Sequence, residues 1–309
     1  MLIPTLTGEI GPGELGFTLP HEHLFLLSPG LLSDWPHVFD REAEVDRSVA
    51  MLGAAYRAGV RTVVDVTTID LGRDIGLMQE VARRSPVNVI VATGLHLRPP
   101  GFVNRRIPDA ITELFVHDLT EGIAGTGLRA GVIKIASGEE VKAQNEVHLR
   151  AAARAHVRTG APIITHSDAA TRTGWRQVEV FREEGVELDR VVIGHVGDTT
   201  DVGYLAQLAE AGAILGMDRF GTGLGANDDQ RVATVAELCR RGLAGSMVLS
   251  HDTSCYSDTL PWKVREKTLP HWDLTYIPNH IIPALRSAGV GEADVEAMTV
   301  TNVRRLWAR

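Results

Sequence analysis

The 309-residue chain has little cysteine, no excess of positive charge and no long apolar run. Its two cysteines, Cys239 and Cys255, are too few for a disulfide framework in a chain of this length. Lys and Arg total 31 against 39 Asp and Glu, and this net charge of −8 argues against nucleic acid or an anionic membrane surface as a partner. No apolar stretch approaches the ~18–20 residues that span a bilayer.

The N-terminal stretch MLIPTLTGEIGPGELG also lacks a basic region followed by an apolar core, so the sequence predicts no signal peptide. Hydrophobic residues make up 44% and charged residues 23%, which are the proportions of a globular protein. We therefore expect a soluble cytoplasmic protein that binds neither nucleic acid nor a membrane.

Short β-branched runs alternate with longer segments of helical period. Eight runs have the nearly continuous apolar character of parallel strands buried on both faces: 17–25, 62–68, 88–96, 130–137, 162–167, 191–196, 213–218 and 247–252. Between them lie segments such as DVGYLAQLAEAG, which repeat apolar residues at helical spacing and end in Gly. Eight βα units predict an α/β fold, a (β/α)8 TIM barrel in which residues 1–309 form one domain and a last helix closes the barrel.

The competing architecture is a doubly wound sheet. Such a sheet usually has a Gly-rich phosphate loop after its first strand. This chain has HEHLFLLSPG at that position, which favours the barrel.

The stretch LPHEHLF places His21 and His23 on one face of a strand and Glu22 on the other. Two such imidazoles are either a surface feature or half of a metal site. Four more polar residues fall near the ends of predicted strands: Lys134, His166, His195 and Asp252. Because the carboxyl ends of barrel strands meet at one mouth, where active sites are built, we predict that all six side chains form one site.

Lys134 is the most informative of the six, because AGVIKIAS surrounds it with apolar residues. Desolvation lowers the pKa of an ammonium from about 10.4, and the neutral amine can then take up carbon dioxide to become a carbamate. The alternative is an unmodified Lys134 paired with Asp252. Four imidazoles, a bridging carbamate and a carboxylate suit two divalent ions, zinc in the first place, with Fe, Co or Mn as alternatives.

In this order, the residues resemble the phosphotriesterase family of the amidohydrolase superfamily. The segments that carry the resemblance are LPHEHL, AGVIKIASG, PIITHS, VVIGHVGDT, GMDRFG and LSHD, and it extends from about Gly8 to Trp307. The resemblance implies a binuclear metal centre with the following ligands: His21, His23 and Asp252 on the buried metal, His166 and His195 on the exposed metal, and carboxylated Lys134 between them.

Within that family, GMDRFG and SHDTSCY look more like the phosphotriesterase-like lactonases. The organophosphate-specialised enzymes carry a His where this chain has Arg219, and a longer loop after the seventh strand. This chain departs from the lactonases at His96, where they place a Tyr, and in the loop GTGLGANDDQR, which is small and polar rather than apolar. We expect His96 and Arg219 in the substrate pocket. We predict a preference for compact lactones because the loop offers little apolar surface for a long acyl chain.

Three further residues near the carboxyl ends of the strands have expected roles, and for two of them the sequence leaves two alternatives. Asp198 either relays a proton from Asp252 or caps the helix that begins near Asp201. Arg219 either donates two parallel hydrogen bonds to substrate oxygens or pairs with a neighbouring carboxylate. Cys255 is expected at the pocket as a packed thiol rather than a nucleophile.

These inferences predict a binuclear-metal-dependent hydrolase that acts on lactones and has promiscuous phosphotriesterase activity. A hydroxide would attack the carbonyl or phosphoryl centre, with Asp252 accepting the proton and returning it to the leaving group. We expect a homodimer acting on a small-molecule lactone or ester. The alternatives are a phosphotriesterase, aryl esterase or amidase as the main activity, and a non-catalytic small-molecule-binding barrel.

Overall fold

The computed structural model describes residues 2–308, and its main feature is a nine-stranded parallel sheet. The order of the strands in the sheet is β10-β9-β8-β7-β6-β5-β4-β3-β11. Their bounds are β3 (Thr18–Leu26), β4 (Thr62–Asp65), β5 (Asn88–Gly94), β6 (Val132–Ala136), β7 (Ile163–His166), β8 (Val191–Ile193), β9 (Ile214–Met217), β10 (Met247–Leu249) and β11 (Ser254–Ser257). All eight predicted runs contain a strand.

The sheet closes because β10 and β11, at opposite ends of the strand order, are consecutive pieces of the chain. β10 pairs with β9, and β11 pairs with β3 so that Ser254 lies opposite His23. Between the two pieces, the Asp252 N–H donates to the His21 carbonyl (3.0 Å) and the His23 N–H to the Thr253 carbonyl (2.8 Å). The predicted (β/α)8 barrel is therefore confirmed, with its last strand divided in two.

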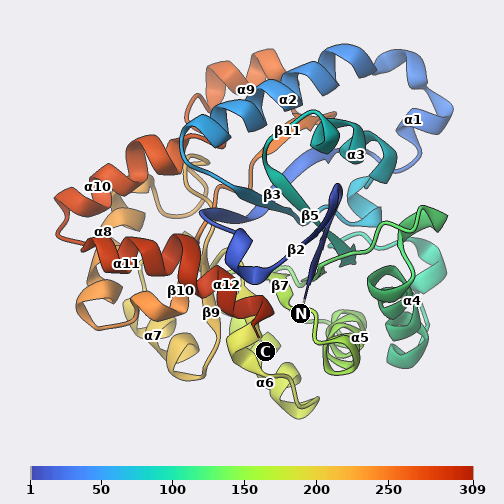
Figure 1. The fold of residues 1–309 in the computed structure, drawn as a ribbon. Helices are drawn as coiled ribbons and strands as arrows, with labels where there is room; N and C mark the ends of the chain where they lie inside the picture. The colour runs from blue at the N-terminus through green and yellow to red at the C-terminus, as the bar shows by residue number, and fades with distance from the viewer. Residues whose placement is uncertain (1, 309) are drawn as a thin grey trace.

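Helices lie around the outside of the sheet (Figure 1). Those that follow β3 to β9 in turn are α2 (Arg41–Arg57), α3 (Ile75–Arg83), α4 (Pro108–Thr120), α5 (Ala143–Thr159), α6 (Thr173–Glu183), α7 (Val202–Glu210) and α8 (Asp228–Arg240). Shorter helices complete the chain: α1 (Leu31–Asp34), α9 (Trp262–Thr268), α10 (Ile282–Ser287), α11 (Glu292–Glu296) and α12 (Asn302–Trp307), with π-helical segments Ile277–Ile281 and Ala297–Thr301. Among residues 2–308, no helix is both long and apolar enough to cross a membrane.

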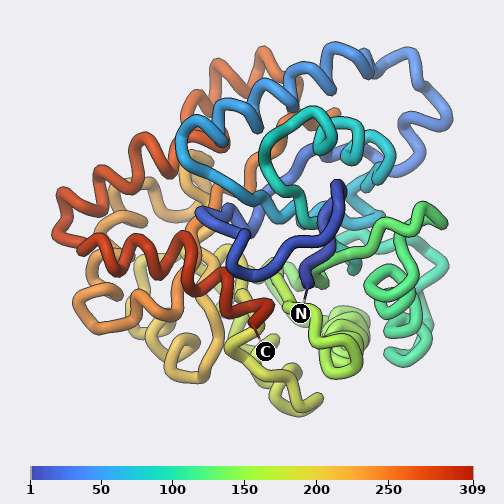
Figure 2. Tube along the Cα trace, in the orientation of Figure 1, coloured from blue at the N-terminus to red at the C-terminus, as the bar shows by residue number. Residues whose placement is uncertain are grey.

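The amino end of the barrel is filled and covered, which leaves the carboxyl end for a site. Alternate strand residues such as Val132 and Ile164 pack inside the barrel with Ile3 of the hairpin β1 (Ile3–Thr5)–β2 (Gly8–Ile10) and with Trp307 of α12. Trp307 Nε1–H also donates to the Gly131 carbonyl (2.9 Å). Figure 2 shows the two chain ends on this same side of the molecule.

Candidate metal centre

The six predicted residues line one cavity of about 420 Å³: His21, His23, Lys134, His166, His195 and Asp252. Strand alternation explains part of this. Val132 and Ile164 point into the barrel, so Lys134 and His166, two residues further along the same strands, point inward as well.

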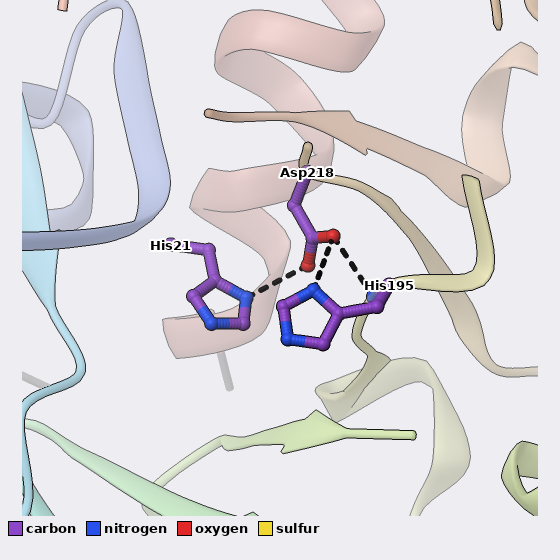
Figure 3. A group of neighbouring side chains, drawn as sticks. All are labelled: His21, His195 and Asp218. Atoms are coloured by element: carbon purple, nitrogen blue, oxygen red, sulfur yellow. Dashed lines mark hydrogen bonds and ion pairs between the residues drawn. The ribbon is translucent and has the colours of Figure 1, made fainter. Parts of the chain in front are cut away.

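Asp218 lies between His21 and His195 and was missed by the sequence analysis (Figure 3). Its Oδ2 is 2.7 Å from His21 Nδ1, and its Oδ1 is 3.0 Å from His195 Nδ1. The signal for it was present in the sequence, because Asp218 ends the predicted strand AILGMD, where an acidic residue is out of place unless it has partners.

The hydrogen bonds of Asp218 fix which ring nitrogens carry protons. Burial alone would raise the pKa of Asp218, but His195 and His21 hold it well below its usual value. Burial lowers the pKa of His21, and lowers that of His195 to about 4, so both rings are neutral near pH 7. Because a carboxylate only accepts, each Nδ1 must donate, which leaves each Nε2 with a free lone pair.

These lone pairs lie near the Asp252 carboxylate. His21 Nε2 is 3.6 Å from Asp252 Oδ1, and His195 Nε2 is 3.8 Å from Asp252 Oδ2. Electron-rich atoms gathered in a buried pocket are stabilised by positive charge, which Arg219 supplies at Asp252 Oδ2 and which a divalent ion would supply at the ring nitrogens. His23 Nε2 is 3.3 Å from Asp252 Oδ1, and its Nδ1 is 2.8 Å from the Thr67 hydroxyl oxygen. Imidazole nitrogens with a carboxylate, oriented by outer partners, therefore fit a divalent metal.

Two of these residues have left-handed backbone. His195 has φ of 63° and Asp252 has φ of 56°, values that non-glycine residues adopt at a cost in free energy. Such strained conformations persist only where the surrounding structure holds them in place, and they occur most often at functional sites.

Lys134 is fully buried, as its apolar strand predicted. Burial lowers its pKa to about 7. Its Nζ lies 2.7 Å from His21 Nε2 and donates to the Thr165 carbonyl (3.2 Å). The neighbours of Lys134 Nζ are therefore His21 and the Thr165 carbonyl. The direct hydrogen bond to Asp252, which the alternative of an unmodified Lys134 required, comes from Arg219 instead.

Glu22, on the opposite face of β3 from the histidines, positions the segment that carries Asp252. Its Oε1 accepts from the Ser250 hydroxyl (2.8 Å) and from His251 N–H (2.8 Å), and its Oε2 accepts from Thr253 N–H (2.8 Å). The histidines and Glu22 of HEH therefore serve the same site from opposite faces of one strand.

Arg219 lies between two carboxylates. Its Nε donates to Asp252 Oδ2 (3.1 Å) and its Nη1 to Asp198 Oδ2 (2.8 Å). Burial alone would lower the pKa of Arg219, but Asp252 and Asp198 hold it above its usual value. Of the two interpretations of Arg219, the structure shows the pairing with neighbouring carboxylates, while hydrogen bonds from its remaining Nη1 and Nη2 protons to substrate oxygens stay a prediction.

Asp198 does not cap a helix, so the prediction that it caps the helix beginning near Asp201 is wrong. Asp201 caps α7 by accepting from Tyr204 N–H (3.0 Å). Asp198, in the 3₁₀ turn Val196–Asp198, binds Arg219 and also accepts from Arg231 Nη2 (2.7 Å). The hydrogen-bonded connection from Asp252 to Asp198 runs through Arg219, and a guanidinium does not give up its proton. Asp198 is a positioning residue for Arg219.

The cavity has an apolar wall, contrary to our expectation. It consists of Leu26, Leu71, Leu224, Leu260, Leu269 and Trp272. The short loop after β9 supplies only Leu224 among them, and three of the others come from the long segment after β11. His96 lines the cavity as expected, with Nε2 3.4 Å from His166 Nδ1, and burial lowers its pKa to about 2.

Cys255 belongs to the core, and its predicted place in the substrate pocket is wrong. Because Ser254 lies opposite the inward-facing His23, the next residue on β11 points to the outer face. There Cys255 packs in the core between strands and helices and shares a hydrogen bond with Ser48 of α2. Burial raises the pKa of its thiol to about 12, so it is a packed thiol as expected.

Comparisons with known proteins agree with this geometry. The model of the phosphotriesterase family matches residues 1–307. A Mycobacterium tuberculosis protein named phosphotriesterase homology protein is 44% identical over 317 residues, covering 99% of this chain and 97% of that protein. A Saccharolobus solfataricus protein named aryldialkylphosphatase is 37% identical over 301 residues, covering 96% of each chain. The solved structure of the phosphotriesterase from Mycobacterium tuberculosis superposes with a TM-score of 0.96 at 42% identity, covering 100% of this chain and 99% of that one. The chain therefore belongs to the phosphotriesterase family of hydrolases.

Proposed function

We propose that the chain is a two-metal hydrolase whose main substrates are lactones with an aliphatic chain, and which hydrolyses phosphotriesters more slowly. The observation that carries this proposal is the lining of the cavity, in which the polar residues of the candidate metal centre occur together with five leucines and Trp272. A substrate with one polar reacting group and one apolar chain matches this lining.

The metals would be held by His21, His23 and Asp252 and by His166 and His195, with a carbamate of Lys134 between them. Bound divalent ions supply Lewis-acid polarisation of the substrate oxygen and a nucleophile at neutral pH. The pKa of Lys134, near 7, supports the carbamate, because a large fraction of neutral amine is available. Its Nζ forms a bond to the carbon of CO₂ and releases one proton to solvent.

Asp252 and Arg219 would handle the proton and the developing charge. Burial alone would raise the pKa of Asp252, but His195, His23, His21 and Arg219 hold it well below its usual value. Asp252 therefore enters the reaction as a carboxylate that accepts a proton from the attacking water. It returns that proton to the ring alkoxide as the C–O bond of the lactone breaks. Arg219 stays charged and keeps Asp252 oriented.

The apolar wall favours a lactone over a phosphotriester. A lactone with one acyl chain can lay that chain along the leucines, whereas a phosphotriester must place three substituents in the same cavity. Each buried methylene contributes about 0.8 kcal/mol, or roughly a fourfold gain. The wall therefore replaces our expectation of compact substrates with one of aliphatic chains of intermediate length.

The test is kcat/KM of the metal-loaded protein on γ- and δ-lactones, butanoyl to dodecanoyl homoserine lactones, an aryl dialkyl phosphate, an aryl ester and an amide. We expect lactones to exceed the phosphate by at least about tenfold. A dominant phosphate, ester or amide activity contradicts the lactone assignment. Two bound metals with no turnover on any of them would instead support the non-catalytic barrel. Asp252→Ala is the control for contaminating activity.

A further inference from the structure

The loop between β9 and α8 (residues 218–227, the β9–α8 loop) is packed against Asp198. The Ala226 N–H donates to the Asp198 carbonyl (3.0 Å). Gly225 has φ of +63°, and a Cβ there would meet the Asp198 carbonyl oxygen at 2.6 Å and its Cβ at 2.7 Å. Only a residue without a side chain allows this approach, so the loop and Asp198 fit each other closely.

Arg231 forms hydrogen bonds both to the β9–α8 loop and to Asp198. It lies in the first turns of α8, and its side chain is 0% exposed. One nitrogen, Nη2, donates both to Asp198 Oδ1 (2.7 Å) and to the Leu224 carbonyl. The other oxygen of Asp198 accepts from Arg219. Arg231 thus connects the backbone of the β9–α8 loop to the carboxylate that holds Arg219.

In the described part of the chain, the hydrogen bonds of Arg231 use only one of its three guanidinium nitrogens. Its Nε and Nη1 are buried without a hydrogen-bond partner in the described part of the chain, and the nearest carboxylate oxygen to Nη1 is Asp228 Oδ1 at 3.6 Å. Buried unpaired donors reduce the free energy of unfolding. A methionine would fill similar space without unpaired donors, but it would leave the Asp198 carboxylate with Arg219 in place of two arginines.

Leu224 is the part of the loop that reaches the substrate cavity. Its side chain lines the cavity and is 56% exposed, so an apolar ligand group could cover it. We propose that Arg231 is a positioning residue that holds the Leu224 side chain in its place in the apolar wall. Selectivity for apolar substituents would then depend on a residue that touches no substrate. The inference rests on the proposed function only in taking this cavity as the substrate site.

The test measures binding rather than turnover, using n-alkylphosphonates from ethyl to octyl with metal-loaded protein by calorimetry. In the parent protein, each methylene that reaches the wall should tighten binding by about fourfold. In Arg231→Met and in Leu224→Ala, we expect that increment to fall to about twofold or less, with ethylphosphonate affinity changed little. The double variant should show no further loss, because both changes remove the same contact. Arg240→Met, an exposed arginine on the same helix, is the matched control and should behave like the parent.

Arg231→Lys tests the reach of the side chain. A lysine ammonium can also donate to two acceptors, but its Nζ lies one bond short of the position of Arg231 Nη2, which makes both contacts, so we expect a partial loss of the increment. Gly225→Ala disturbs the loop with Arg231 intact and should reduce the increment as well. If Arg231→Met does not fold by circular dichroism, Gly225→Ala and Leu224→Ala and their double variant decide the question.

A parent-like increment in Arg231→Met overturns the proposal, as does an additive double variant. An equal loss for every phosphonate, ethyl included, also overturns it, because Arg231 would then act on the metal centre instead. If the parent hydrolyses no lactone but its increments depend on Arg231, the proposed function fails and this inference stands.

Discussion

A single oxygen of Asp218 holds both the backbone and the ring of His195. Asp218 Oδ1 accepts from His195 N–H (2.8 Å) and from its Nδ1 (3.0 Å). His195 is one of the two candidate ligands with left-handed backbone, so the carboxylate fixes the main chain and the ring orientation together. The other oxygen orients the ring of His21, whose backbone N–H donates to the Ser250 hydroxyl instead.

Asp218→Asn should weaken metal binding by roughly 10- to 100-fold. An amide presents one acceptor and one donor, so one of the two histidines would have to move its proton from Nδ1 to Nε2, where it blocks a ligand. The measurement is metal affinity by chelator competition. Asp201→Asn is the matched control, because Asn caps a helix as well as Asp does. Unchanged affinity in Asp218→Asn would contradict this account of the tautomers.

The dialysed protein should contain about two divalent metal ions per chain. We expect this because His21, His23 and Asp252 form one group of close donors, and His166 and His195 line the same cavity. Elemental analysis gives the count, and chelation should abolish activity that added metal restores. A stoichiometry of one, with activity insensitive to chelators, would rule out the binuclear centre.

Lys134→Ala should abolish activity and lower the metal content, and short carboxylic acids added with metal should partly restore both. The reason is that a carboxylate can replace the carbamate as a bridging anion. The direct measurement is a carbamate carbon signal by NMR after incubation with ¹³C-bicarbonate. A metal-loaded protein that binds two ions and shows no such signal would disprove the modification.

Lys134 should also make the stability of the metal-free, CO₂-free protein rise with pH between about 7 and 10. The pKa of Lys134 is about 7 in the folded chain against a usual value of 10.5. In that interval the unfolded chain holds a proton that the folded chain has released, so the free energy of unfolding increases with pH. Relative to Lys134→Met, the slope should be steeper by up to about 1.4 kcal/mol per pH unit, measured by urea unfolding. Parallel slopes would show that the lysine is not desolvated.

The strands and the inward-facing site residues could be predicted because they follow local rules. Buried parallel strands are apolar throughout, so Lys134 and His166 stand out within them. Asp218 is equally out of place in its strand, but its role depends on His21, which lies 197 residues away, and the role of Glu22 depends on His251, which lies 229 residues away. The HEH motif drew attention to its histidines, although its acidic residue is just as deeply buried.

The substrate end of the cavity followed no such rule. Leu260, Leu269 and Trp272 come from the segment after β11, where the short helix α9 is the only regular element before residue 277 in the described chain. Only the fold of that segment brings them to the same cavity as Leu224. Cys255 was misplaced for a related reason. The interruption between β10 and β11 resets which residues face the barrel interior, and no pattern in LSHDTSCY marks it.

The seam between β3 and β11 has a consequence for how the chain folds. Glu22 and His251, hydrogen-bonded across it at 2.7 Å, are 229 residues apart in sequence. A metal ion held by His21, His23 and Asp252 would tie β3 to the segment just before β11, as a cross-link between residues up to 231 positions apart in the 309-residue chain. The entropy lost on closing a loop grows only slowly with its length, so one such ion can hold the entire ring shut. Losing the ion would then weaken the barrel where its two ends meet, and not only the chemistry at its mouth.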